Sequence, residues 1–167
     1  MIIFAVFISQ TLCMYIVAID PDVDKSGVAI LDTSYHRLSL MSLSFPELVE
    51  YLMGLQGSKA TTVCVEAGWK INSNWHIKRY DSKQSACAKG NSTGRNHEVG
   101  RKMVELCEYW KIPCKTIKPL RKCWKGKDGK ITHNEIKSVL NGMNIKCPAR
   151  TNQEERDATL IAITYGR

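Results

Sequence analysis

Short apolar runs separated by turn residues occupy the first part of the chain. Three of them have the length of β-strands, and they lie at Tyr15–Ile19, Gly27–Leu31 and Arg37–Leu43. The third also shows alternation, at Leu38 and Leu40. A fourth run, Thr61–Val65, is apolar and rich in β-branched residues, which is typical of a strand buried on both faces. We therefore expect this run to lie in the centre of a sheet, beside the first strand.

Helical signals follow the third of these runs. Ser44 with Glu47 forms a capping box, which predicts a helix that runs to about Gln56 and ends near Gly57. Between Ala67 and Arg95 the chain is polar and aperiodic. This stretch is therefore predicted to be a long loop, of the kind that is usually functional or disordered.

Helical spacing returns after this stretch. Asn96 is predicted to cap a helix, and Cys114–Ile117 is predicted to form a short strand. Thr132 with Glu135 is a second capping box and predicts another helix. The last helix has two alternative caps, which are Asn152 with Glu155 and Thr151 with Glu154. Its core-facing residues are predicted to be Ala158, Ile161, Ala162 and Tyr165. This order of strands and helices predicts an α/β domain with a mixed sheet.

Length and composition favour a single domain. A chain of 167 residues with 44% hydrophobic content is long enough for one core and short for two. The domain is expected to span residues 14–167, because Met14 directly begins a strand and leaves residues 1–13 as an extension. These apolar residues lack the positive region and the cleavage site of a signal peptide, so no secretory role is predicted. Polar residues interrupt that extension, so no membrane association is predicted. Seven cysteines, an odd number without a CxxC pair, indicate a cytoplasmic location.

Four carboxylates stand where predicted strands end or a predicted helix begins. Asp20 and Glu66 directly follow the first and the fourth apolar run, and Glu154 and Asp157 share one face at the start of the last helix. If the two strands are neighbours and the helix begins above them, these acids converge, which is repulsive unless cations bind between them. Mg²⁺ is the natural cation, because it prefers carboxylate oxygens and water. By itself, the pair in the helix would be explained by the helix dipole.

Positive charge surrounds these acids in the sequence. A net charge of +8 indicates a polyanionic partner, with nucleic acid as the first candidate. Eight basic residues against the single acid Asp128 lie between Lys111 and Lys130. A solvated charge run is the usual explanation, but beside an acidic metal site the segment is better explained as a phosphate clamp. Trp69, Trp75 and Trp124 could stack on unpaired bases or equally anchor the core.

The order of these acids and their neighbours resembles the RuvC-type Holliday junction resolvases. Ile19–Ile30 is similar to the first motif of this family, in which a catalytic Asp precedes Pro and a Gly opens the returning strand. Val65–Glu66 is similar to the second motif. Glu154–Thr164 is similar to the third, in which two acids three apart precede an Ala-rich helix. The resemblance extends in order and spacing from Tyr15 to Tyr165.

The resemblance implies a ribonuclease H-like α/β fold, with a mixed five-stranded sheet flanked by helices. It also implies a homodimer that resolves branched DNA, namely four-way junctions, through paired nicks and metal-dependent hydrolysis. The catalytic metal ligands would be Asp20, Glu66, Glu154 and Asp157. Two Mg²⁺ ions are expected, for which Mn²⁺ could substitute. The small size is typical of a phage or mobile-element branch. The alternatives are a ribonuclease H-like nuclease acting on RNA–DNA hybrid or other branched nucleic acid, and a non-catalytic junction-binding protein.

DNA contacts are expected from the basic segment and from the helix that follows it. In the basic segment they are Lys118, Arg121, Lys122, Lys125 and Lys130. A basic residue that the family often carries near the scissile phosphate falls on His133, with Lys137 close by. A protonated imidazole there could donate to a phosphate oxygen.

Overall fold

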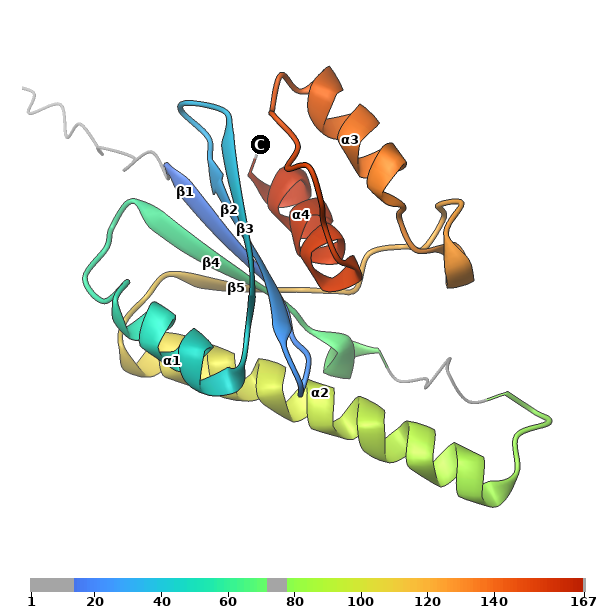
Figure 1. Cartoon of the computed structure of the whole chain (residues 1–167). Coiled ribbons are helices and arrows are strands. Elements are labelled where there is room, and N and C mark those ends of the chain that lie inside the picture. The colour runs from blue at the N-terminus through green and yellow to red at the C-terminus, as the bar shows by residue number, and fades with distance from the viewer. Residues whose placement is uncertain (1–13, 72–77, 167) are drawn as a thin grey trace, which may run out of the picture.

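A five-stranded mixed sheet forms the centre of the molecule (Figure 1). The computed structural model describes residues 14–71 and 78–166, so the N-terminal extension and Trp75 lie outside the described residues. The strands are β1 (Tyr15–Asp20), β2 (Ser26–Asp32), β3 (Arg37–Leu43), β4 (Thr61–Glu66) and β5 (Cys114–Ile117), in the spatial order β3-β2-β1-β4-β5. All five strands predicted from the sequence are confirmed within one residue at each end.

Strand direction brings two strand ends to one edge of the sheet. β1 pairs with β4 in parallel, and β4 pairs with β5 in parallel, whereas β2 and β3 are antiparallel to their neighbours. The side chains of β1 alternate between two core clusters, with Val17 and Ile19 in one and Ile16 and Ala18 in the other. Because both faces of the central strands are buried, the C-terminal ends of β1 and β4 are held rigidly side by side.

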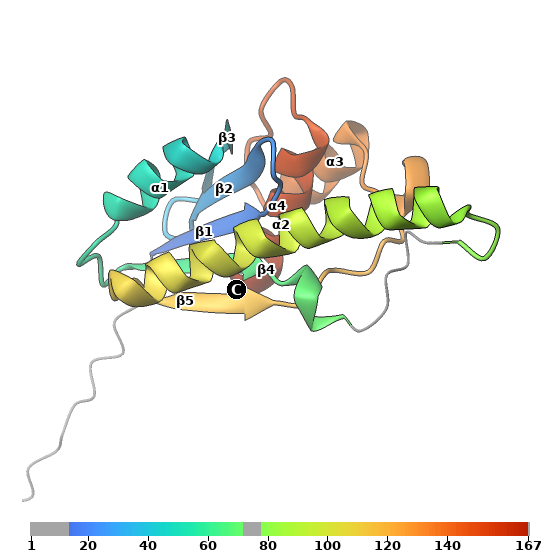
Figure 2. The same ribbon diagram turned by 90° about the horizontal axis from the view of Figure 1, so that it is seen from below.

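Two pairs of helices cover the two faces of this sheet (Figures 1 and 2). On one face lie α1 (Phe45–Met53) and α2 (Lys83–Tyr109), with Leu48, Leu52 and Met103 in the core. On the other face α4 (Gln153–Tyr165) packs against β1 and β2, and α3 (His133–Gly142) packs against α4. Short 3₁₀ turns at Gly68–Lys70 and Lys127–Gly129 complete the regular structure of the described residues.

The predicted loop between Ala67 and Arg95 is wrong over its second half. Ser82 caps α2 by accepting a hydrogen bond from the Ser85 amide, and Asn96 lies inside this helix of 27 residues. The buried residues of α2 all belong to its C-terminal half, because its N-terminal half continues past the ends of the strands (Figure 2). That half has no core to face, so its sequence carries no apolar periodicity.

The other helices begin where the capping boxes predict them. Ser44, Thr132 and Asn152 are the N-caps, so of the two alternatives for the last helix the pair Asn152 with Glu155 is correct. α1 ends earlier than predicted, at Met53 with Gly54 as its C-cap. Tyr165 was expected in the core but is 39% exposed, because α4 ends there at the rim of the sheet. None of the helices in the described ranges combines the length and the apolar character needed to span a bilayer.

Candidate active site

Two carboxylates end neighbouring strands and form the floor of the site. Ile19 of β1 pairs with Val65 of β4, so Asp20 and Glu66, the next residues, extend from the same edge of the sheet. Both side chains are partly buried. The sequence prediction that these two strands are neighbours is thereby confirmed.

The first turn of α4 brings Glu154 and Asp157 to this edge, and a glycine makes the approach possible. Gly27 lies opposite Asp20 in the β1–β2 pair. A Cβ atom at Gly27 would stand 2.1 Å from the Glu154 carbonyl oxygen and 2.2 Å from its carbonyl carbon. No side chain fits there, so glycine is needed for the backbone of α4 to lie on β2.

Side-chain hydrogen bonds hold the same turn of α4 from the β3 side. Ser42 lies opposite Gly27 in the β2–β3 pair, and its hydroxyl donates to Glu155 at 3.2 Å. The Asn152 amide group donates to the Ser42 hydroxyl at 2.5 Å. Ser42, Gly27 and Asp20 therefore form a row across three strands that fixes the start of α4 above the floor.

Burial and mutual repulsion shift the pKa values of Asp20, Glu66 and Asp157. Desolvation raises the pKa of Asp20 well above its usual range, and the neighbouring Glu66 and Asp157 carboxylates raise it further. Desolvation also raises the pKa of Glu66 to about 7, with a contribution from Asp157. The pKa of Asp157 is raised mainly by desolvation. Ionised carboxylates are therefore unfavourable in this cluster unless positive charge compensates them.

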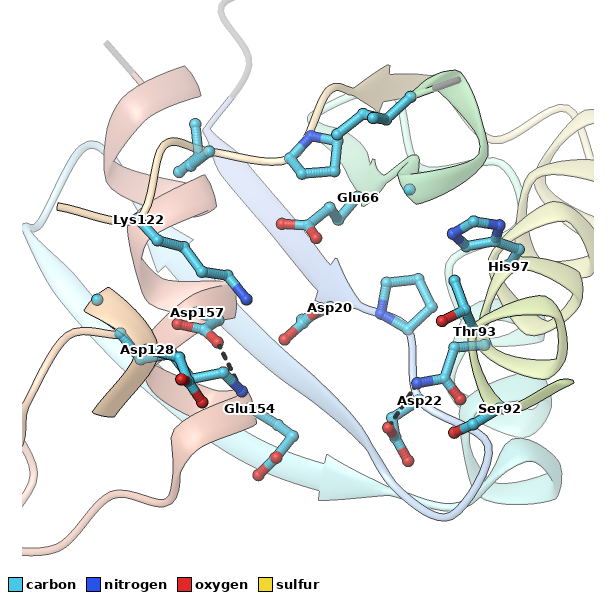
Figure 3. Close-up of a pocket in the computed structure, with 18 of the residues that line it drawn as sticks. Asp20, Asp22, Glu66, Ser92, Thr93, His97, Lys122, Asp128, Glu154 and Asp157 are labelled. Atoms are coloured by element: carbon cyan, nitrogen blue, oxygen red, sulfur yellow. Dashed lines mark hydrogen bonds and ion pairs between the residues drawn. The ribbon is translucent and has the colours of Figure 1, made fainter. Parts of the chain in front are cut away.

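Two lysines of the segment between β5 and α3 supply positive charge to the acids. The Lys130 ammonium nitrogen lies 3.9 Å from Asp157 Oδ2, and it lowers the pKa values of Asp20, Glu66 and Asp157. Lys122 lowers those of Glu66 and Asp157. Desolvation lowers the pKa of Lys122 itself. Figure 3 shows its amino group reaching toward the carboxylates of Asp157 and Asp20.

The acids and lysines line a cleft of about 1070 Å³ whose second wall is α2. Asp22 connects this wall to β1, because it accepts hydrogen bonds from Asn96 Nδ2 at 2.8 Å and from the Asp24 amide at 2.9 Å. Asp22 therefore stabilises the turn that follows β1. On the α2 side the cleft is lined by Lys89, Ser92, Thr93, Asn96 and His97. Figure 3 shows Thr93 and His97 across the cleft from Lys122.

The donor set fits a divalent cation. Figure 3 shows the carboxylates of Asp20, Glu66 and Asp157 around a shared space, with that of Glu154 further out. Within residues 14–71 and 78–166, no three His, Cys, Asp or Glu side chains enclose a metal position as they stand. Like-charged groups separate in this way when only lysines compensate them, and oxygen ligands of this kind suit Mg²⁺ or Mn²⁺. The four-ligand set therefore stays a prediction.

The predicted DNA-contacting residues divide between the cleft and the outer surface. Arg121, Lys122 and Lys130 line the cleft. The remaining four, Lys118, Lys125, His133 and Lys137, are not among its lining residues. The imidazole of His133 forms a hydrogen bond with the Thr151 hydroxyl at 2.8 Å, which connects the start of α3 to the segment before α4. Its predicted contact with phosphate thus has no support from its position.

Sequence reasoning missed the α2 wall because it placed Lys89, Ser92 and Thr93 in a loop and started the helix only at Asn96. The signal that would have found the wall is Ser82, an N-cap residue followed by a stretch without proline. Trp69 was recognised, and it lies in the cleft with its ring under the Arg101 guanidinium, 5.8 Å from the ring centre. It also faces Gly100, where a Cβ atom would stand 2.5 Å from the ring. Trp69 thus packs against α2 while it lines the cleft.

Comparison with solved structures identifies the fold of the chain. No protein-family model and no curated protein sequence matches the chain. A structure of Thermus thermophilus RuvC matches with a TM-score of 0.52 and 15% identity, over 92% of this chain and 93% of that one. T. thermophilus RuvC in complex with a Holliday junction substrate matches with a TM-score of 0.49 and 12% identity, over 92% of each chain. The yeast mitochondrial Holliday junction resolvase matches with a TM-score of 0.46 and 11% identity, over 92% of this chain and 80% of that one.

The first of these matches confirms the predicted fold class, a ribonuclease H-like mixed sheet flanked by helices. The match extends over nearly the whole of both chains, so the sheet and its helices correspond as a unit. The phage or mobile-element branch receives no support from these structures.

Proposed function

From the RuvC fold of this chain, we propose that it is a metal-dependent endodeoxyribonuclease that resolves four-way DNA junctions by paired nicks. The observation that carries the proposal is the position of the acids. Asp20, Glu66, Glu154 and Asp157 lie at one edge of this fold, in a cleft that two lysines enter from a basic segment. A protein that only bound junctions would have no use for partly buried, mutually repelling carboxylates.

The proposed ligands are the same four acids. Asp20 is the central one, because an acid at the end of a central strand is rigidly held and would keep its oxygens in place for the metal. When bound, Mg²⁺ or Mn²⁺ would activate a water and stabilise the leaving 3′ oxygen of a phosphodiester. The product would then carry a 5′ phosphate.

The chain's own residues would bind and orient the scissile strand. Lys122 and Lys130 line the cleft with the acids, and the Lys130 ammonium lies 3.9 Å from Asp157 Oδ2. An ammonium group there can donate to a non-bridging phosphate oxygen and stabilise charge that develops on it. Arg121 extends this positive surface along the same wall. The residues of α2 on the opposite wall would confine the strand between the two sides.

A homodimer is part of the proposal. Paired nicks on two strands of a junction need two active sites in one assembly, and a symmetric dimer supplies them. T. thermophilus RuvC, whose fold this chain shares, has been solved with a Holliday junction substrate.

The test is cleavage of an end-labelled four-way DNA junction in Mg²⁺, with linear duplex and RNA–DNA hybrid of matching sequence as competitors. The proposal predicts symmetric nicks in the junction, no cleavage in EDTA and restored cleavage in Mn²⁺. Preferential cleavage of the hybrid would keep the metal site but assign the chain to ribonuclease H-like chemistry. Binding of the junction without cleavage in either metal would contradict a nuclease function.

A further inference from the structure

Arg156, between two of the predicted metal ligands, points its guanidinium group away from the cleft into a set of fixed acceptors. Its Nε donates to the Ile131 carbonyl at 2.9 Å, and its Nη1 donates to the Thr151 carbonyl at 2.6 Å. Its Nη2 donates to Gln153 Oε1 at 2.9 Å. All three guanidinium nitrogens are thus engaged, two of them by backbone carbonyls that cannot rotate away. Because the guanidinium group is planar and rigid, it holds its three acceptors near one plane and fixes their relative positions.

This arrangement leaves Gln153 one orientation. An amide group can be turned over to exchange its oxygen and its nitrogen, but Arg156 offers only donors. Gln153 Oε1 must therefore face the guanidinium, and Nε2 must face the opposite direction. There it donates to Asp157 Oδ1 at 2.8 Å. The Arg156 guanidinium therefore determines, through Gln153, that Asp157 receives an N–H donor.

The two oxygens of Asp157 consequently have different roles. Oδ1 is occupied by the Gln153 amide, whereas Oδ2 faces Lys130 in the cleft at 3.9 Å. Arg156 fixes this partner as well, because the carbonyl that accepts from Nε belongs to Ile131, the residue after Lys130. One guanidinium group therefore connects the first turn of α4 to the end of the basic segment.

We propose that Arg156 and Gln153 are positioning residues that present Asp157 Oδ2, and not Oδ1, to the divalent cation. This inference rests on the proposed metal-dependent function. Partners of this kind around a ligand commonly change metal affinity or activity by about 10-fold to 100-fold when they are removed.

The experiment replaces each residue by one of similar size and follows Mg²⁺ binding directly. Gln153→Met keeps the length of the side chain and removes the donor, and Arg156→Lys keeps the charge but cannot hold three acceptors. The melting temperature of each purified variant is measured across a Mg²⁺ titration. The Mg²⁺ concentration that gives half of a fixed rise is taken as the midpoint, because it is proportional to the metal dissociation constant. Junction cleavage across the same titration gives a second midpoint.

Matched controls are Gln84→Met and Arg150→Lys. Gln84 lies exposed in the first turn of α2, as Gln153 lies in the first turn of α4, and Arg150 is exposed before α4. Neither residue lines the cleft. Both controls should retain the wild-type Mg²⁺ midpoint.

The inference predicts that Gln153→Met and Arg156→Lys each move both midpoints to about tenfold higher Mg²⁺. A purely structural role would lower the melting temperature at every Mg²⁺ concentration and leave the midpoint in place. Unchanged midpoints in Gln153→Met, with a wild-type chain that binds Mg²⁺, would overturn the inference alone. A wild-type chain that gains no stability from Mg²⁺ and cuts no junction would overturn the proposed function, and this inference with it.

Discussion

The carboxylates and the lysines of the cleft face one another from different kinds of structure. Asp20 and Glu66 end buried parallel strands, and Glu154 and Asp157 stand in the first turn of a helix that packs on the sheet. The lysines belong to the segment between β5 and α3, whose regular structure is a single 3₁₀ turn at Lys127–Gly129. The acidic side of the cleft is therefore built on strands and a helix, whereas the basic side is built on an irregular segment with long side chains.

This difference explains how a repelling cluster is maintained. The acids cannot relax away from one another at their backbones, so the pKa values of Asp20, Glu66 and Asp157 are raised and a cation is attracted. The lysine side chains are long, so their ammonium groups can move toward the acids or toward a phosphate, while turn hydrogen bonds and Arg156 hold the backbone at Lys130 and Ile131. Substitutions on the acidic side should therefore stop the chemistry, whereas substitutions on the basic side should weaken it by degrees.

The largest effect is expected from Asp20→Asn. It removes a charge from the centre of the acidic side, so cleavage should fall by about a thousandfold or more, which corresponds to several kcal/mol of transition-state stabilisation. Junction binding should stay intact or become tighter, because a negative charge near DNA phosphates is lost. Single-turnover cleavage and a gel-shift titration measure the two effects. Asp24→Asn, in the exposed turn after β1, is the control and should cut normally.

Gly27→Ala tests whether the rigid packing of α4 matters. The added Cβ would collide with the Glu154 backbone, so the first turn of α4 must shift. Cleavage should fall by about a hundredfold, and unfolding should become easier by about 1–3 kcal/mol, as for other overpacked sites. Gly142→Ala is the matched control, because a Cβ atom there meets nothing within 4 Å. Full activity in Gly27→Ala would show that the position of Glu154 is not critical.

On the basic side, comparing Lys122→Met with Lys125→Met distinguishes the role of a lysine in the cleft from that of a lysine outside it. Lys122 lines the cleft and Lys125 does not, although both belong to the same segment. Lys122→Met should lower the cleavage rate about tenfold to a hundredfold, since it removes a donor to the reacting phosphate. Lys125→Met should leave that rate unchanged, and the two together should weaken binding to all DNA and reduce the salt slope by about two. An unchanged slope in the double variant would contradict a phosphate clamp.

The smallest effect is expected on the pH dependence of the melting temperature in the absence of metal, and Glu66 is its source. Glu66 titrates near 7 in the folded chain and near 4.5 when unfolded, so the folded state binds the proton more tightly. Its contribution to stability is fully present below the unfolded pKa and is lost as the pH rises through the folded pKa. In EDTA, the melting temperature of the wild type should therefore fall between about pH 5 and pH 7 more steeply than that of Glu66→Gln. Parallel curves would show that the Glu66 pKa is not raised.

The strands and the acids could be predicted because local patterns determine them. β1 and β4 are short apolar runs with an acid directly after each, and Asn152 caps α4 in the ordinary way. The start of α2 could not be predicted, because its first half extends past the sheet and carries no apolar stripe.

The partners of individual side chains could not be predicted from the sequence either. His133 falls beside the basic segment in sequence, yet the structure pairs it with Thr151 outside the cleft. Gln153 and Arg156 lie among the acids of α4, but their bonds to Asp157 and Ile131 depend on how the basic segment folds back. Such contacts between distant segments follow from tertiary packing and leave no periodic signal.

The most direct test of the account is the position of a bound cation. Crystals of the chain grown with Mn²⁺ and measured at the manganese absorption edge would show it as anomalous density. The account predicts density between Asp20, Glu66 and Asp157, with Glu154 turned inward to join them and the Lys130 ammonium displaced. Density elsewhere, or none at saturating Mn²⁺, would contradict the claim that these four acids form one metal centre.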